Sequence, residues 1–208
     1  MKEFKHLPGL DLIRVFGILV VVFYHYQVET AVRGLCPADF LPAMEPLVQV
    51  AVYTMTLLSG SCLCWQEKSR SWSMKRYLWG RFLAIYPLFW LCFFPIFFYS
   101  DIICGNNEGV APWKLLLSIV GVDGYFQSFT PTFYKIGEWY LGCILFLYAV
   151  FPVLWRMIRR RGVVFAAVGA LFAWLACCFV ENPGQLYPTL IGQLPLFFMG
   201  IFLGGCLP

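Results

Sequence analysis

Charged residues are scarce in this chain: Asp, Glu, Lys and Arg together account for 12% of its 208 residues, whereas soluble domains contain about 25%. A hydrophobic content of 61% leaves too few polar groups to cover a surface exposed to water. These values exclude an ordinary water-soluble enzyme, a disordered chain and a nucleic-acid-binding module built on a basic surface. A polytopic membrane protein remains, and we expect membrane lipids rather than nucleic acid as its surroundings.

Motifs for nucleotide, metal and nucleophile chemistry are also absent from the sequence. It contains no Walker loop, no GxGxxG fingerprint and no GxSxG nucleophile elbow. Most of the nine cysteines lie within apolar runs, without the spacing of zinc ligands. We therefore expect no metal site and no permanently bound cofactor.

Six apolar segments are long enough to cross a membrane, since a transmembrane helix needs about 20 mostly apolar residues. They fall at about 10–31, 46–65, 82–103, 138–156, 162–181 and 188–206. A shorter apolar stretch at about 113–126 is interrupted by Gly121, Asp123 and Gly124, which predicts a half-span or an interfacial helix. The sequence thus predicts an all-α fold, a polytopic transmembrane helix bundle of about six spans. We expect a single membrane-embedded domain over residues 1–208.

Basic residues are unevenly distributed about these spans. Twelve of the 15 Lys and Arg residues fall on one side, before and just inside the first span, at 68–81 and at 156–161. The positive-inside rule assigns that side to the cytoplasm. We therefore expect a multi-pass protein of the cell (plasma or inner) membrane with a cytoplasmic N-terminus.

The first apolar segment carries Arg14 and His25, which are 11 residues apart. At about 100° per residue this separation is within roughly 20° of three full turns, so the two side chains share one face. Asp11 and Glu29 extend the face by one turn at either end. His25 would lie about 16 Å from Arg14, near the membrane midplane when Arg14 is at the cytoplasmic boundary.

This pattern has two readings. A neutral imidazole at that depth suits a general base, and an arginine at the cytoplasmic mouth suits a phosphate. The spacing alone fits equally well a histidine that packs between helices and an arginine that reaches the membrane surface.

In the spacing of Arg14 and His25, the chain resembles the acyltransferase-3 family of integral membrane acyltransferases. The first span of that family carries an Arg that is followed by ten residues and a His. Further stretches resemble family blocks in the same order. They are LLSGSCL at 57–63, KRYLWGRFLAIYPLFW at 75–90, GEWYLGCILFLYAVFP at 137–152 and LPLFFMGIFLG at 194–204.

The resemblance implies an enzyme that transfers an acyl group, usually acetyl from cytoplasmic acetyl-CoA, to a hydroxyl of an extracytoplasmic glycan or lipid-linked saccharide. Such O-acetylation modifies polysaccharides of the cell envelope. His25 would be the catalytic base and Arg14 a contact for the acyl-CoA. Glu29 and Glu138 are the residues that could orient His25.

The chain departs from the family pattern in two ways. Arg81 matches the first arginine of the family's Arg-x-x-Arg pair, but Ala84 occupies the second position. We therefore expect Arg76, or alternatively Lys75, to help bind the acyl-CoA. The family domain usually has about ten spans, so the sequence predicts a domain incomplete at its C-terminus. Two alternatives remain open, a non-enzymatic transporter or channel that uses the intramembrane Arg and His, and a non-functional fragment of the full enzyme.

Overall fold

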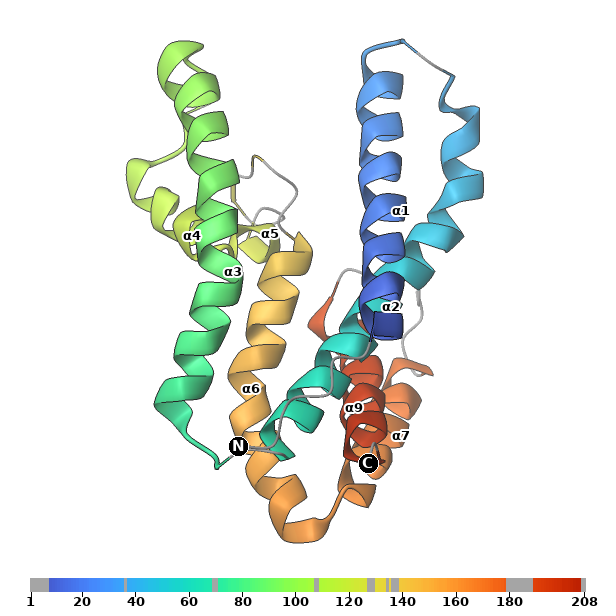
Figure 1. Ribbon diagram of the computed structural model, residues 1–208. Helices are drawn as coiled ribbons and strands as arrows, with labels where there is room; N and C mark the ends of the chain where they lie inside the picture. The colour runs from blue at the N-terminus through green and yellow to red at the C-terminus, as the bar shows by residue number, and fades with distance from the viewer. Residues whose placement is uncertain are drawn as a thin grey trace. The chain divides into compact units, whose positions relative to one another are not determined.

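The computed structural model describes residues 8–35, 37–68, 71–106, 109–126, 130–133, 135, 139–178 and 189–206, and all regular secondary structure in them is helical (Figure 1). The predicted all-α fold is confirmed. The helices are α1 (Pro8–Val32), α2 (Leu41–Lys68), α3 (Met74–Phe97), α4 (Leu115–Val120), α5 (Asp123–Phe126), α6 (Trp139–Arg161), α7 (Val164–Cys178) and α9 (Leu190–Cys206). A π-helical turn, η2 (Phe98–Ile103), follows α3, and 3-10 turns occur at Ala38–Phe40 and Pro112–Lys114.

Four helices of the described residues are long and apolar enough to cross a membrane: α1, α2, α3 with η2, and α6. The apolar helices α7 and α9 have 15 and 17 residues. The chain is therefore a helical membrane protein, while the count of six spans stays a prediction. Helix α3 begins at Met74, so it includes the exposed residues Lys75 and Arg76 ahead of the apolar segment that the sequence predicts from about residue 82.

The chain forms two compact units. Unit 1 comprises Met1–Arg70, Met157–Tyr187 and Ile191–Pro208, and unit 2 comprises Ser71–Arg156 and Pro188–Leu190. The chain passes from unit 2 to unit 1 within α6, so most of that helix belongs to unit 2.

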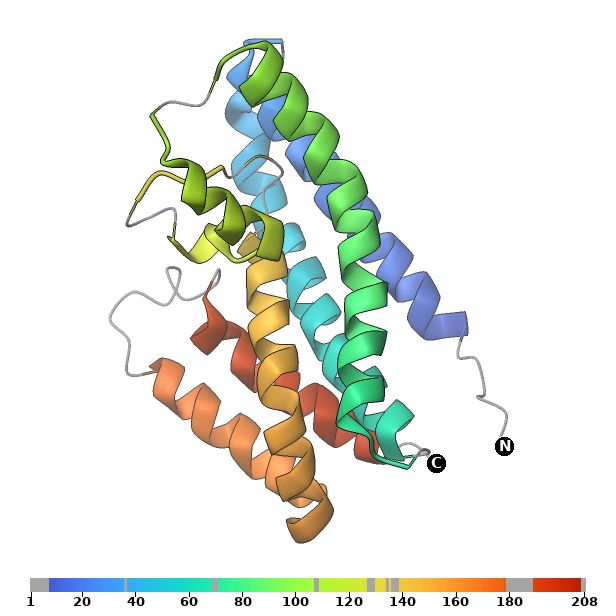
Figure 2. The same ribbon diagram turned by 90° about the vertical axis from the view of Figure 1, so that its left-hand side faces the viewer.

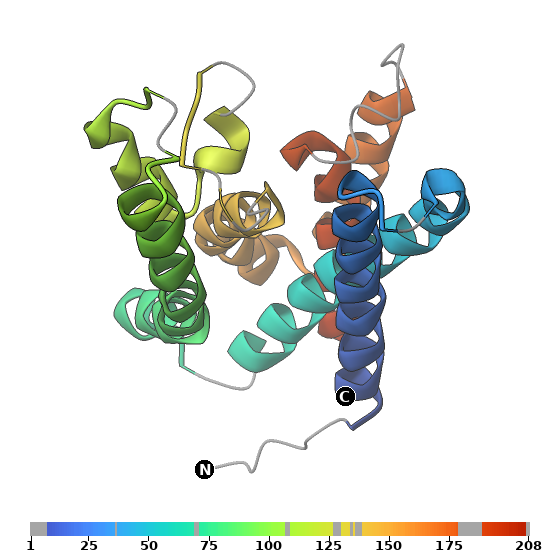
Figure 3. The same ribbon diagram turned by 90° about the horizontal axis from the view of Figure 1, so that it is seen from above.

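In unit 1, α1 packs on α2, which crosses it obliquely (Figures 1 and 3). Val20 of α1 is buried with Val48 and Ala51 of α2 in a small apolar core. Gly17 lies beside Met55: a Cβ atom on this glycine would be 3.6 Å from the Met55 sulfur. Small residues at the crossing therefore let the two helices approach closely.

The contact between α2 and α9 is closer still. A Cβ on Gly200 would overlap the carbonyl oxygen of Leu57, and one on Gly204 would overlap that of Ser61. From the other side, Gly60 leaves no room for a Cβ against α9. The small-residue pair of α9, Gly200 and Gly204, thus packs helices as its spacing indicates.

Hydrogen bonds accompany this close packing. The buried Thr56 hydroxyl of α2 lies 2.7 Å from Oε1 of Gln193 on α9 and donates to it, and the Ser61 hydroxyl donates to the Gly200 carbonyl at 2.8 Å. Polar side chains among apolar helices are stable only when they are paired in this way. Helix α7 packs on α9 in turn, with Gly169 facing the Phe198 ring (Figure 2).

In unit 2, α3 packs along α6. The Tyr77 hydroxyl of α3 donates to the Tyr148 carbonyl of α6 at 2.7 Å, and the Tyr77 ring stacks on Phe151 with centroids 5.5 Å apart. Helices α4 and α5 lie beside α3 and the N-terminal end of α6 (Figure 2). Unit 2 therefore consists of two long helices and a short helical hairpin.

Helix α4 ends beside the middle of α3. Its last carbonyls, on Ile119 and Val120, accept hydrogen bonds from the Trp90 indole at 2.9 Å and the Tyr86 hydroxyl at 3.0 Å. Gly121 then turns the chain in a left-handed conformation, with φ of 79°. Tyr86 is about 18 Å along α3 from its start, and both the half-span and the interfacial helix stay predictions.

Gly200→Ala is expected to destabilise unit 1, because the new methyl group has no space against the α2 backbone. Overpacking of this kind costs about 1–3 kcal/mol, which a thermal unfolding scan of the purified protein in detergent would detect as a lower midpoint. Gly9→Ala is the matched control, since nothing lies within 4 Å of a Cβ at Gly9 on α1. Equal midpoints for the two variants would contradict the packing role.

Topology follows from the distribution of basic residues. A reporter fused after Arg161 should be cytoplasmic and one fused after Asn107 extracytoplasmic. The basic segments at 68–81 and 156–161 are separated by two predicted spans, so both lie on the cytoplasmic side and the loop between those spans lies on the other side. Alkaline phosphatase and green fluorescent protein fusions measure the two cases, and a reversal at either position would overturn the predicted map.

Candidate functional site

The polar face that the sequence predicts for the first span is present on α1. Helix α1 is unbroken from Pro8 to Val32, so Arg14 and His25 share one face as their spacing predicts. The His25 side chain is exposed, and its ring makes an edge contact with Tyr24 at a centroid distance of 5.9 Å. Among the described residues, His25 has no hydrogen bond or ion pair. The exposed imidazole is therefore not committed to a partner among the described residues.

Arg14 is held by two neighbours within unit 1. Its Nη1 donates to the Asp11 carboxylate at 3.1 Å, one turn earlier on α1, and its Nη2 donates to the Cys62 sulfur on α2 at 2.8 Å. The side chain is 37% exposed. A guanidinium has five N–H donors, so donors remain for a phosphate oxygen.

Of the two acidic residues predicted to orient His25, the structure describes Glu29 but not Glu138. Glu29 forms an ion pair with Arg33 at 2.6 Å on the next turn of α1, and its side chain is 60% exposed. It makes no described bond to His25. Glu138 lies outside the described residues, directly before Trp139, where α6 begins.

Arg76 and Arg81 both belong to α3 in unit 2. Arg76 is exposed and donates to the Ser71 carbonyl. The Arg81 guanidinium lies over the Tyr148 ring of α6, with Cζ 5.6 Å from the ring centroid. Its Nε is buried and lacks a hydrogen-bond partner in the described part of the chain. A buried donor without a partner is costly, and the contact with the Tyr148 ring is the described interaction of this guanidinium.

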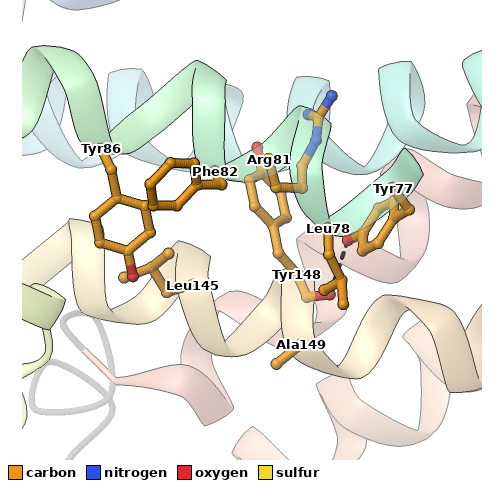
Figure 4. Close-up of a pocket in the computed structure, with 8 residues that line it drawn as sticks. All are labelled: Tyr77, Leu78, Arg81, Phe82, Tyr86, Leu145, Tyr148 and Ala149. Atoms are coloured by element: carbon orange, nitrogen blue, oxygen red, sulfur yellow. Dashed lines mark hydrogen bonds between the residues drawn. The ribbon is translucent and has the colours of Figure 1, made fainter. Parts of the chain in front are cut away.

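A pocket of about 190 Å³ lies beside Arg81, between α3 and α6 (Figure 4). Its apolar lining comes from four side chains: Leu78, Phe82, Leu145 and Ala149. Tyr77 stands at one end and Tyr86 at the other (Figure 4). The pocket is thus an apolar space with one cationic residue on its wall.

The hairpin of α4 and α5 buries a carboxyl group against α6. Asp123 and Ser118 are both fully buried. The hairpin fits closely because Gly124 has no side chain: a Cβ there would lie 2.6 Å from the Trp139 Cα. Burial raises the pKa of Asp123, and neither of its carboxylate oxygens has a hydrogen-bond partner among the described residues.

A second buried carboxylate lies in η2. Lys135 Nζ is 3.1 Å from Oδ1 of Asp101, whose side chain is 1% exposed. Lys135 also donates to Ser100 and to the Asn106 carbonyl, at 3.4 and 3.5 Å. Removal of one partner of a buried pair leaves an uncompensated charge, so this ion pair holds Lys135, three residues before Glu138, against the end of α3.

Several of these contacts were missed by sequence reasoning. Cys62 lies within an apolar run of the sequence, yet it contacts Arg14. Tyr148 was part of a matched block without a role, yet it lies under Arg81. The hydrophobic pattern carries no signal for such contacts between helices, although the pair Asp101 and Lys135 could have been suspected as opposite charges flanking apolar segments.

Taken together, the helices and their polar groups define a membrane protein with ionisable residues inside an apolar bundle, a class in which such residues serve transport or catalysis. A sequence model of the acyltransferase-3 family, described as an acyltransferase domain, matches residues 7–205. The chain belongs to this family.

One curated relative is the acyltransferase MdmB of Streptomyces mycarofaciens. The chain is 26% identical to it over 191 residues, which cover 85% of this chain and 47% of the relative. The chain therefore spans about half the length of that relative. No solved structure matches the chain significantly.

The raised pKa of Asp123 predicts a pH dependence of stability. A carboxyl whose pKa is raised by folding stabilises the fold when protonated, and this contribution is lost as the pH rises from about 4, the ordinary pKa of Asp, through the raised value. Asp123→Asn mimics the neutral acid, so its unfolding midpoint should fall less between pH 4 and pH 8 than that of the wild type.

Thermal unfolding at a series of pH values measures this difference. Asp39→Asn is the control, because Asp39 is exposed and should leave the wild-type pH dependence intact. If the unfolding midpoint of Asp123→Asn fell as steeply between pH 4 and pH 8 as that of the wild type, Asp123 would not account for the pH dependence of stability.

Proposed function

We propose that this protein is an integral membrane O-acyltransferase of the cell envelope. It transfers an acyl group from cytoplasmic acyl-CoA to a hydroxyl of an extracytoplasmic glycan or lipid-linked saccharide, with its N-terminus in the cytoplasm. The polar face of α1 carries the proposal, since Arg14 and His25 stand three turns apart on an unbroken helix. Family membership and the name of the Streptomyces relative support acyl transfer.

Arginines bind the donor. The phosphates of CoA are too polar to enter the membrane and stay at the cytoplasmic ends of the helices, where guanidinium groups bind phosphate strongly. Arg14, Arg76 and Arg81 are the residues assigned to this task. The flexible pantetheine arm then carries the thioester along the helix towards His25.

His25 acts as the general base. Its neutral imidazole takes the proton of the acceptor hydroxyl as the oxygen attacks the thioester carbonyl. The new C–O bond forms, the C–S bond breaks, and the CoA thiolate takes the proton back from the imidazolium. The products are an O-acyl ester and free CoA, and no enzyme-bound acyl intermediate is required.

A carboxylate beside His25 would stabilise the imidazolium. Glu29 is one turn away on α1 and is bound to Arg33, so it must exchange that partner to serve His25. Glu138 is the other acidic residue assigned to this role. Either group would act by orienting the ring and by balancing its charge.

His25→Ala is expected to abolish transfer while CoA binding is retained. Loss of a general base typically costs about 10²–10⁴-fold in rate, whereas the phosphate contacts do not involve His25. Acyl transfer to a saccharide acceptor and binding of CoA by calorimetry would be measured on the same purified protein. Near-normal transfer by His25→Ala would show that this histidine is not the general base.

Arg14→Ala, in contrast, is expected to weaken CoA binding, because it removes a guanidinium assigned to the CoA phosphates. Arg160→Ala is the matched control, since Arg160 is an exposed arginine in the last turn of α6 with no assigned role in binding. Equal losses of affinity in the two variants would mean that CoA is held only by general charge attraction, and the assignment of Arg14 would fail.

A further inference from the structure

We infer that Cys62 of α2 is a positioning residue, which holds the Arg14 guanidinium in place for the phosphates of the acyl-CoA. The inference rests on the proposed function, because that function assigns Arg14 to the donor. It concerns unit 1 alone and depends on the contacts that Arg14 makes with residues of two different helices.

The Arg14 side chain is held both along α1 and across to α2. Asp11, one turn earlier on α1, accepts a hydrogen bond from Nη1 at 3.1 Å, and the Cys62 sulfur accepts one from Nη2 at 2.8 Å. The Asp11 side chain is 44% exposed, and an exposed ion pair within one helix contributes little to holding a long side chain. The contact with α2 is therefore the one that fixes the guanidinium.

The crossing of the two helices brings Cys62 to Arg14. Along this interface Val20 is buried with Ala51, and Gly17 lies beside Met55 (Figure 1). The helices run in opposite directions, so residues before Gly17 on α1 meet residues after Met55 on α2. The contact between Arg14 and Cys62 thus continues the α1–α2 interface towards the end that the sequence predicts to be cytoplasmic.

Cys62 belongs to a part of α2 that is itself fixed. The neighbouring Ser61 hydroxyl donates to the Gly200 carbonyl of α9 at 2.8 Å, and a Cβ on Gly204 would overlap the Ser61 carbonyl oxygen. Helix α2 cannot move away from α9 at this level without the loss of that hydrogen bond. The sulfur is therefore an acceptor in a set position, as a pre-organised binding site requires.

A thiol suits this task because it accepts a hydrogen bond without adding negative charge. A phosphate bound to Arg14 would also lie near Asp11, and like charges repel. The carboxylate that helps to hold Arg14 therefore weakens its attraction for the donor, whereas the Cys62 sulfur does not. A guanidinium has five N–H donors, so the two bonds leave others that can bind a phosphate.

A double-mutant cycle on CoA binding tests the inference. The affinity for CoA would be measured by calorimetry, under reducing conditions, on wild type, Cys62→Ala, Arg14→Ala and the double variant in nanodiscs. Without the sulfur, Arg14 must be ordered when CoA binds, so Cys62→Ala should bind CoA about 2- to 12-fold more weakly. In the Arg14→Ala background the same change should have no further effect, because Cys62 acts through Arg14.

Two variants and a kinetic measurement complete the design. Cys62→Ser keeps an acceptor at the same position and should restore binding relative to Cys62→Ala. Cys92→Ala removes an exposed cysteine of α3 and should bind CoA as the wild type does. With a saccharide acceptor, Cys62→Ala should raise KM for the acyl-CoA and leave kcat unchanged, because His25 is intact.

Wild-type affinity in Cys62→Ala overturns the inference and leaves the proposed function standing. A loss of the same size with and without Arg14 also overturns it, since Cys62 would then only support the packing of α2. If Arg14→Ala bound CoA as tightly as the wild type, the donor site of the proposed function would be refuted, and the inference with it.

Discussion

An apolar solvent cannot satisfy a polar group, and this constraint governs the whole structure. Hydrocarbon offers no hydrogen bond to a backbone carbonyl or a hydroxyl, so each one must find a partner within the protein. The bond between Thr56 and Gln193 links α2 to α9 in this way. At the end of α4, the Trp90 and Tyr86 side chains supply donors that water would supply in a soluble protein. Helix α4 ends beside the middle of α3 with its last carbonyls satisfied because these partners are present.

The same constraint makes the polar groups that are left without a partner informative. The His25 ring has no described hydrogen bond, and the Arg81 Nε is buried without one. A buried donor without a partner costs free energy. The His25 ring is exposed, so that cost of burial does not apply to it, and the ring is open to the acceptor hydroxyl of the proposed acyl transfer.

The sequence blocks that resemble the family correspond largely to close packing. Gly60, in the block at 57–63, contacts the backbone of α9 within the block at 194–204, and Gly200 of the latter contacts the α2 backbone in return. In unit 2, Gly142 of the block at 137–152 leaves room for the Tyr125 ring, which a Cβ would meet at 2.9 Å. These glycines keep the helices close enough for the polar contacts to form, so the blocks preserve the scaffold on which the site depends.

The sequence by itself determined the helical class, the approximate positions of the long helices and the face shared by Arg14 and His25. These properties follow from composition and from the 3.6-residue period, which are local. Only the tertiary structure decided that Cys62 contacts Arg14, that Tyr148 lies under Arg81 and that the α4–α5 hairpin buries its carboxyl group against α6. Such contacts depend on which helices are neighbours and how each is rotated, and that is set by the fit of side chains from distant segments.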